Sequence, residues 1–225
     1  ASAVDRYLKP FLLGKDPLRI EDVWQSSFVS SYWRNGPVLG NALSGVDVAL
    51  WDILGKRAGL PLYQLLGGKC RTAVPTYRHA GGGDFAGVER QVQSYLEQGY
   101  RHVRVHVSVP EVAAYGAAGT RGDAGLPANR RARVWEPRPY VHTIPRLFEH
   151  LRNKFDDRVE LLHDVHERLP PILAIQLAKD LEPYRPFFLE DPLSPEDVGY
   201  FKHLRRQTST PIAMGELFNN PHEWT

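Results

Sequence analysis

Three short segments decide the fold of this chain: VELLHD (159–164), PFFLED (186–191) and PIAMGE (211–216). Each segment is a mostly apolar run followed by a carboxylate, and the carboxylates follow one another at equal intervals of 26 residues. A helix-like stretch fills each interval, and one strand, one helix and two short loops make a unit of this size. Repeated units of this kind place their strands side by side and parallel. The sequence therefore predicts an α/β fold with a partial TIM-type (β/α) barrel.

The carboxylates that close these segments are Asp164, Glu190 and Glu216. The carboxyl ends of parallel strands meet at one edge, where barrel enzymes carry their chemistry. Three carboxylates converging there offer hard oxygen ligands to a divalent cation, most naturally Mg²⁺. A single acidic residue at a strand end is more often a helix N-cap or a surface charge. It is the equal spacing of three that favours a metal site.

The rest of the chain divides at about residue 70. Residues 1–70 have a helical pattern, whereas strand and helix alternate from residue 71 to 225. The first two strands are expected in AVPTYRH (73–79) and RHVRVHVSV (101–109). A long stretch at about 111–139 is rich in Gly, Ala, Arg and Pro, which is typical of a lid-like loop.

Composition excludes several classes of protein. A net charge of +2 gives no reason to expect a nucleic-acid or membrane partner. The single Cys70 excludes an internal disulfide and a cysteine zinc site, and it is consistent with a cytoplasmic location. The sequence contains no run of about 18 apolar residues and no secretory signal pattern, so it predicts no transmembrane helix.

Strand periodicity places further polar side chains beside the predicted metal site. Residues i and i+2 of a strand share a face, so His166 is expected beside Asp164, and Arg104 beside His106. A histidine next to the metal is well placed to give a proton to a leaving hydroxyl. Without that neighbour, a satisfied or exposed histidine is the more common explanation of position 166; beside Asp164 the two explanations are about equal.

Several motifs resemble a known family. The segment GVDVALWDILGKRAGLPLYQLLGG (45–68) is similar to the signature of the mandelate racemase/muconate lactonizing enzymes, in the enolase superfamily. The HD-V-H, LEDP and GE elements resemble the parts that hold that superfamily's three metal ligands. The resemblance implies that 1–70 is the helical remainder of an α+β capping domain. It also implies that 71–225 holds the first five βα units of a barrel and that the chain is truncated at both ends.

Within that superfamily, the chain looks most like the D-mannonate dehydratase branch, which includes proteins named starvation-sensing proteins. The similar segments are YWRNGPV (32–38), YRHAGGGD (77–84), the Arg-x-His of 104–106 in place of Lys-x-Lys, and the Tyr of AAYGAAG. The resemblance implies that Arg104 and Tyr115 form the base and that His166 is the acid. It also places His79 and His106 at the substrate, with His106 at the position where relatives often carry Gln.

These expectations agree with elementary chemistry. A free tyrosine has a pKa of about 10, and a nearby guanidinium lowers it, so Tyr115 is a suitable base only if Arg104 is close. By itself, a tyrosine in such a loop is more often a packed surface aromatic. Mg²⁺ on the substrate's oxygens would stabilise the charge that develops when the proton beside the carboxylate leaves.

The resemblance predicts a Mg²⁺-dependent aldonate dehydratase of the D-mannonate or D-gluconate type that yields a 2-keto-3-deoxy sugar acid. The expected partner is a small sugar acid, and the full-length protein is expected to be a homo-oligomer. One alternative is a non-catalytic or regulatory relative that keeps the metal site, which the LEDP segment favours. Another is an acid-sugar racemase or cycloisomerase, against which the missing Lys-x-Lys argues.

Overall fold

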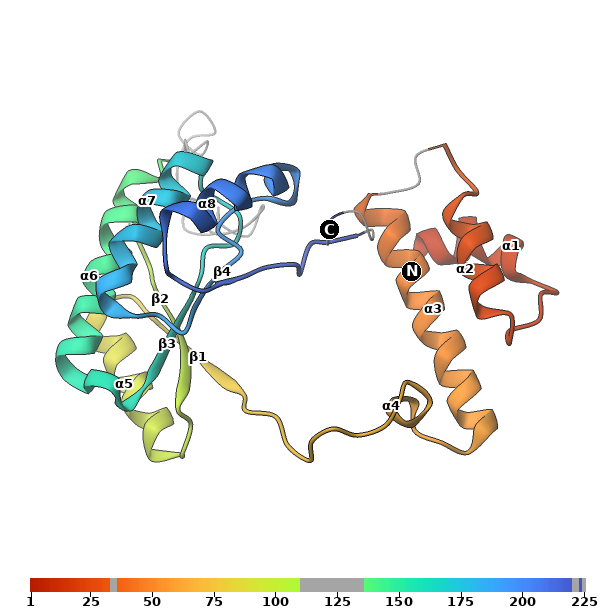
Figure 1. The fold of residues 1–225 in the computed structure, drawn as a ribbon, viewed down its shortest axis with the longest axis horizontal. Coiled ribbons are helices and arrows are strands. Elements are labelled where there is room, and N and C mark those ends of the chain that lie inside the picture. Colours follow the sequence, from red (N-terminus) through yellow and green to blue (C-terminus); the bar gives the residue numbers. More distant parts are fainter. Residues whose placement is uncertain (33–35, 110–135, 220–222, 224–225) are drawn as a thin grey trace, which may run out of the picture. The chain divides into compact units, whose positions relative to one another are not determined.

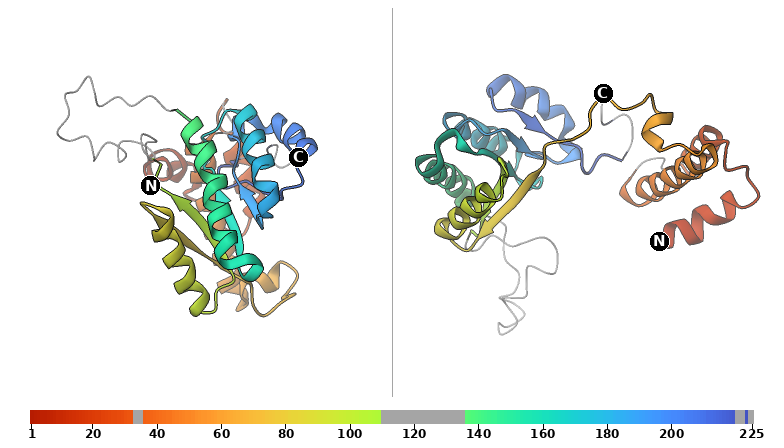
Figure 2. Two further views of the ribbon diagram at one scale, coloured as in Figure 1. Left: turned by 90° about the vertical axis from the view of Figure 1, so that its left-hand side faces the viewer. Right: turned by 90° about the horizontal axis from the view of Figure 1, so that it is seen from below.

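The computed structural model describes residues 1–32, 36–109, 136–219 and 223 (Figures 1 and 2). The chain forms two compact units, one of Ala1–Val74 with Leu217–Thr225 and one of Pro75–Glu216. These units divide between Val74 and Pro75, near the predicted boundary at 70/71. The end of the chain groups with the helical unit rather than with the sheet.

The first unit is helical, as predicted. Its elements are the π-helix η1 (Val4–Leu8), α1 (Lys9–Leu12), α2 (Ile20–Phe28), α3 (Pro37–Ala58) and α4 (Leu62–Leu65). Helix α3 begins at a proline, which needs no helical partner for its missing N–H. It ends at Gly59, whose φ of 67° is the left-handed conformation that glycine adopts without strain.

Helix α3 also bears on the predicted absence of a membrane span. Within the described residues, α3 is the one helix whose length and composition would let it cross a membrane, and 17% of its apolar window is buried. The sequence predicts no such helix because Asp47 and Asp52 interrupt the apolar run. Length and composition alone are a weak indicator, since helices of compact domains pass the same test.

The second unit is built on a parallel sheet, which confirms the predicted βα alternation. The strands are β1 (Tyr77–Gly82), β2 (His102–Val107), β3 (Glu160–Asp164), β4 (Phe188–Glu190) and β5 (Ile212–Ala213). They lie in the order β1-β2-β3-β4-β5, and every neighbouring pair is parallel. All five carboxyl ends therefore point to the same edge, as a partial barrel requires.

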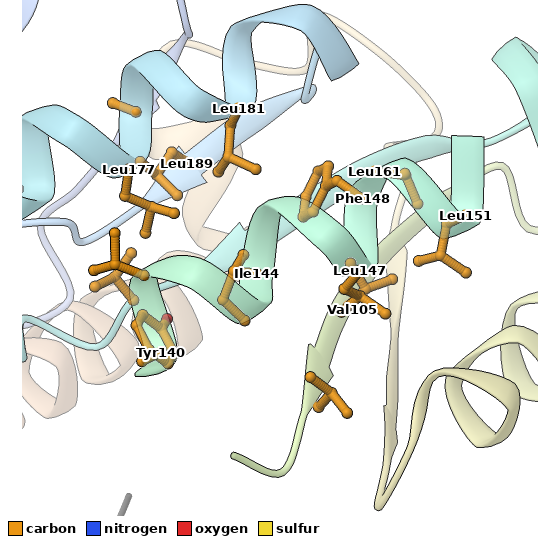
Figure 3. Packing of buried hydrophobic residues seen from close by; sticks show 14 of the residues in the cluster. Val105, Tyr140, Ile144, Leu147, Phe148, Leu151, Leu161, Leu177, Leu181 and Leu189 are labelled. Carbon is orange, nitrogen blue, oxygen red and sulfur yellow. The ribbon is translucent and has the colours of Figure 1, made fainter. Parts of the chain in front are cut away.

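Helices connect the strands and cover one face of the sheet (Figure 1). These elements are α5 (Phe85–Glu97), α6 (Arg138–Phe155), η4 (Asp156–Arg158), α7 (Pro171–Leu181), η5 (Glu182–Tyr184), η6 (Pro195–Tyr200) and α8 (Phe201–Gln207). Helix α6 supplies much of the core. Its residues Ile144, Leu147, Phe148 and Leu151 pack toward α7 and the strands (Figure 3), and Phe155 near its end is also fully buried.

Alternation along β2 separates the core from the candidate site. Val103, Val105 and Val107 are buried among the helices, whereas Arg104 and His106 stand on the opposite face. Successive side chains of a strand point to opposite sides, so burying the valines fixes the direction of the polar pair. The hydrophobic core thus decides which side chains reach the interior of the partial barrel.

Candidate active site

A cavity of about 330 Å³ opens at the carboxyl ends of β2 and β3. Its lining comes from the ends of β2 and β3, the residues that follow each of them, and the start of α6: Arg104, Val105, His106, Val107, Ser108, Val109, Tyr140, His163, Asp164, Val165, His166 and Arg168. The ladder between β2 and β3 ends at the pair Arg104 and Leu162. Beyond that pair the backbones of the two strands no longer pair with each other, and the cavity lies there.

Arg104 is the central charge of this site. Its Nη1 donates a hydrogen bond to Oδ2 of Asp164 and lies 3.5 Å from Oε2 of Glu190. Its Nη2 lies 3.2 Å from Nδ1 of His79. Asp164 and Glu190 are themselves paired in register across β3 and β4. Four predicted site residues therefore meet at one point.

The two carboxylates differ in their electrostatics. Burial alone would raise the pKa of Asp164, but the hydrogen bond from His166 and the charges of His166 and Arg104 hold it below its ordinary value. Burial raises the pKa of Glu190, and the negative charge of Asp164 raises it further. Among the described residues, Glu190 Oε2 is buried without a hydrogen-bond partner. A buried pair of this kind is stabilised by a cation between its members.

This donor set fits a divalent metal ion. Asp164 and Glu190 are paired in register on β3 and β4, and carboxylate oxygens are the ligands that Mg²⁺ prefers. The guanidinium of Arg104 lies against both, so a positive charge already stands where a metal's charge would be needed. Mg²⁺ and Arg104 Nη1 would therefore compete for Asp164 Oδ2.

Glu216 lies in a different group of carboxylates from the one predicted. In the described part of the chain, the acidic group whose oxygens lie within 4.8 Å of one another is Glu167, Asp191 and Glu216. The backbone turns here, because Asp191 has a φ of 39° and Gly215 a φ of 125°. The N–H of Gly215 also donates to Asp191 Oδ1 at 3.1 Å. Equal spacing in the sequence carries no information about these backbone turns. Glu216 is still the predicted third ligand, but the structure does not place it beside Asp164 and Glu190.

His166 lies where the strand pattern places it, against Asp164. Its Nε2 is 2.7 Å from Asp164 Oδ2, and its backbone N–H donates to Asp164 Oδ1 at 2.9 Å. Its φ of 59° ends the strand by turning the chain into the left-handed region. The side chain is 32% exposed, so the imidazole reaches both the carboxylate and the cavity. This arrangement suits a proton donor to a bound ligand.

The other predicted residues fall into two groups. His79 contacts Arg104, and His106 lines the cavity. Burial, and then the charge of Arg104, lowers the pKa of each of these histidines, which favours neutral imidazoles. Tyr115 lies outside the described residues, as does most of the predicted loop at 111–139.

His163 is a buried residue that the sequence reasoning missed. Its Nδ1 lies 2.7 Å from the carbonyl oxygen of Val105 and its Nε2 lies 2.6 Å from the hydroxyl of Tyr140, which Figure 3 places at the start of α6. His163 therefore bonds β3 to β2 just beyond the last backbone pair, and both to α6. Burial lowers its pKa to about 4. A signal existed in the sequence, since a histidine preceding Asp164 in a strand must face the helices.

Stability should consequently fall in mild acid because of His163. Its pKa is about 4 when folded, against about 6.5 in an unfolded chain. Between these values the unfolded chain binds more protons, so the stability present above pH 6.5 is lost as the pH falls towards 4. At pH 5 the loss is about 2 kcal/mol. Urea unfolding of the wild type and of His163→Gln at pH 7 and pH 5 measures it. Equal pH dependence in both proteins would contradict the assignment.

Two families match the chain. Residues 87–225 match the family described as enolase C-terminal domain-like. Residues 1–67 match the one described as mandelate racemase / muconate lactonizing enzyme, N-terminal domain. The first range contains strands β2 to β5, and the second contains the helices of the first unit.

Curated relatives are similar over almost the whole chain. A D-galactonate dehydratase family member of Musicola paradisiaca is 52% identical, and one of Pantoea ananatis is 54% identical, each over 99% of this chain. The chain spans about half the length of these relatives, 56% of each.

Solved structures agree in fold. An enolase from Pantoea ananatis, with bound D-gluconate and Mg, has a TM-score of 0.86 and 51% identity. The match covers 99% of this chain and 56% of that one. A putative dehydratase from Zymomonas mobilis has a TM-score of 0.76 at 25% identity, covering 96% of this chain and 55% of its own.

Proposed function

Because the chain belongs to the mandelate racemase/muconate lactonizing enzyme family of enolase-like proteins, we propose that it carries the metal-binding part of an acid-sugar dehydratase. The observation that carries the proposal is the meeting of Arg104, Asp164 and Glu190 at the carboxyl edge of the sheet. His166 lies directly beside them. The substrate class is further supported by the similar Pantoea ananatis enzyme, whose structure holds D-gluconate and Mg.

The proposed ligands of Mg²⁺ are Asp164, Glu190 and Glu216. When bound, Mg²⁺ would supply positive charge to the substrate oxygens that become negative during the reaction. Two of these ligands are paired in register, and the buried oxygen of Glu190 lacks any hydrogen bond among the described residues.

The proposed proton transfers use the chain's own side chains. Tyr115, with its pKa lowered by Arg104, takes the proton next to the substrate carboxylate. The C–H electron pair becomes a carbon–carbon double bond, and the bond to the 3-hydroxyl breaks. His166 gives its proton to the departing oxygen, so water leaves. The resulting enol tautomerises to the 2-keto-3-deoxy acid, with D-mannonate and D-gluconate as the proposed substrates.

A second candidate is a regulatory relative without turnover. One observation favours it: Arg104 already neutralises Asp164 and lies near Glu190, so the pair is balanced by a protein cation. A protein that had lost catalysis would keep such a pair for stability. This candidate predicts weak Mg²⁺ binding, because the metal must displace the guanidinium.

One experiment separates the candidates. The whole protein is incubated with D-mannonate, D-gluconate and other aldonates, with Mg²⁺ or with EDTA, and the 2-keto-3-deoxy product is measured. We expect product with at least one aldonate and none with EDTA. Absence of product with every aldonate, despite calorimetric Mg²⁺ binding, would overturn the dehydratase proposal. The predicted cytoplasmic location and homo-oligomer would be tested by fractionation and light scattering.

A further inference from the structure

The imidazole of His106 occupies space that only a glycine at position 81 leaves free. Gly81 of β1 and His106 of β2 are partners in register. A Cβ added to Gly81 would lie within 3.0 Å of two ring atoms of His106, Cε1 and Nε2, which is closer than real Cβ atoms approach their neighbours. The ring therefore lies across the backbone of β1.

Gly81 is held firmly in this position. Its N–H donates to Oε1 of Gln91 at 3.2 Å, and its carbonyl accepts from Nε2 of Gln91 at 2.5 Å. Both groups lie on the side of β1 away from β2, so a side chain of α5 replaces a neighbouring strand there. The adjacent Ala80 is fully buried in the core. The backbone at Gly81 is therefore fixed on both sides.

The two partners differ in how easily they move. Gly81 is not among the residues with positive φ, so an alanine would fit its backbone conformation without strain. The His106 ring is the far end of a rotatable side chain. A methyl group at position 81 would therefore displace the imidazole rather than the strand.

We propose that Gly81 is a positioning residue that sets where the His106 imidazole stands in the cavity and thereby which substrate hydroxyls it meets. The proposal rests on the proposed function, since it assigns His106 to the binding of a sugar acid. His106 lines the cavity on the same face of β2 as Arg104. A neutral imidazole offers one hydrogen-bond donor and one acceptor, which suits the hydroxyl groups of an aldonate.

The substitution Gly81→Ala tests the idea in the whole protein. We expect KM for the preferred aldonate to rise roughly tenfold with a much smaller change in kcat, because a displaced contact weakens substrate binding. The matched control is Gly83→Ala in the same glycine run, where an added Cβ would meet nothing within 4 Å. That control should keep the wild-type KM.

A double substitution identifies the partner. In a His106→Ala background the clash is gone, so adding Gly81→Ala should leave KM unchanged from that of His106→Ala alone. If Gly81→Ala raised KM equally in the wild-type and His106→Ala backgrounds, Gly81 would act through the strand and not through His106, and the proposal would be overturned.

A readout without turnover keeps the inference separate from the proposed function. With ¹³C-labelled histidine, the His106 ring signal, assigned by its loss in His106→Ala, should shift in Gly81→Ala and stay in place in Gly83→Ala. An unmoved signal in Gly81→Ala would refute the positioning role even if the protein is a dehydratase. If the wild type converts no aldonate but the signal shifts, the proposed function fails and the placement of the ring by Gly81 stands.

Discussion

Glu190→Gln is expected to weaken Mg²⁺ binding by more than about 100-fold and to stop dehydration at ordinary Mg²⁺ concentrations, because changes even to the outer partners of a metal cost 10–100-fold. The substitution keeps the size of the side chain and removes its charge. Glu190 suits this test because its buried Oε2 makes no hydrogen bond among the described residues, and its one ion pair there is with Arg104 Nη1 at 3.5 Å.

For the metal-free protein we expect the same substitution to cause no loss of stability. Burial and the charge of Asp164 raise the pKa of Glu190, so its ionised side chain destabilises the folded protein. Removing its charge should leave stability in EDTA unchanged or slightly higher. The wild type should gain stability when Mg²⁺ is added, and the variant should not, because only binding to the folded state stabilises it.

Calorimetry with Mg²⁺, and thermal unfolding with and without the ion, measure both effects. The matched control is Glu160→Gln, an exposed carboxylate at the opposite end of the neighbouring strand β3. It should bind Mg²⁺ as the wild type does. Wild-type Mg²⁺ affinity in Glu190→Gln would remove Glu190 from the metal site.

The sheet was predictable because the strands are apolar runs or alternate apolar with polar residues, and helical patterns lie between most of them. The residues at which helices and strands begin and end were less predictable. The first strand is Tyr77–Gly82 rather than 73–79, since register with β2 and the bonds from Gln91 hold Gly81 in a strand that its propensity disfavours. The segment PRLFEHLRNKF (145–155) predicts a helix that begins at its proline, but α6 begins at Arg138 and Pro145 lies inside it. There, burial of Tyr140 and Val141 outweighs the one lost hydrogen bond.

The positions of candidate-site residues were predictable inside strands, where side chains alternate between the two faces of the sheet, and not beyond the strand ends. Asp164, Glu190, Arg104 and His106 follow from alternation, because all lie within strands. Glu216 lies after β5, where Gly215 turns the backbone, and it joins Asp191 and Glu167 instead. After such a turn, alternation along the sequence no longer tells which face a side chain is on. No pattern in one sequence indicates that Arg104 would bridge two predicted ligands.

His166→Asn is expected to lower kcat for dehydration by roughly 100- to 10 000-fold, the usual contribution of a general acid. Asparagine is the suitable replacement because position 166 has a φ of 59°, which asparagine tolerates better than most residues. Its backbone N–H can still donate to Asp164 Oδ1, so the ligand keeps that contact. Loss of the imidazole contact to Asp164 Oδ2 should lower Mg²⁺ affinity by about 10- to 100-fold, so kcat is measured at saturating Mg²⁺.

The decisive measurement for His166→Asn is exchange in D₂O. If His166 only protonates the leaving hydroxyl, the base remains intact, and the variant should still exchange the proton beside the substrate carboxylate while forming almost no product. Arg185→Asn serves as the control, since it places asparagine at another positive φ, 47°, outside the cavity, and it should keep the wild-type kcat. Loss of exchange together with product would assign His166 to the base or to the metal site. An unchanged kcat would mean that another group supplies the proton.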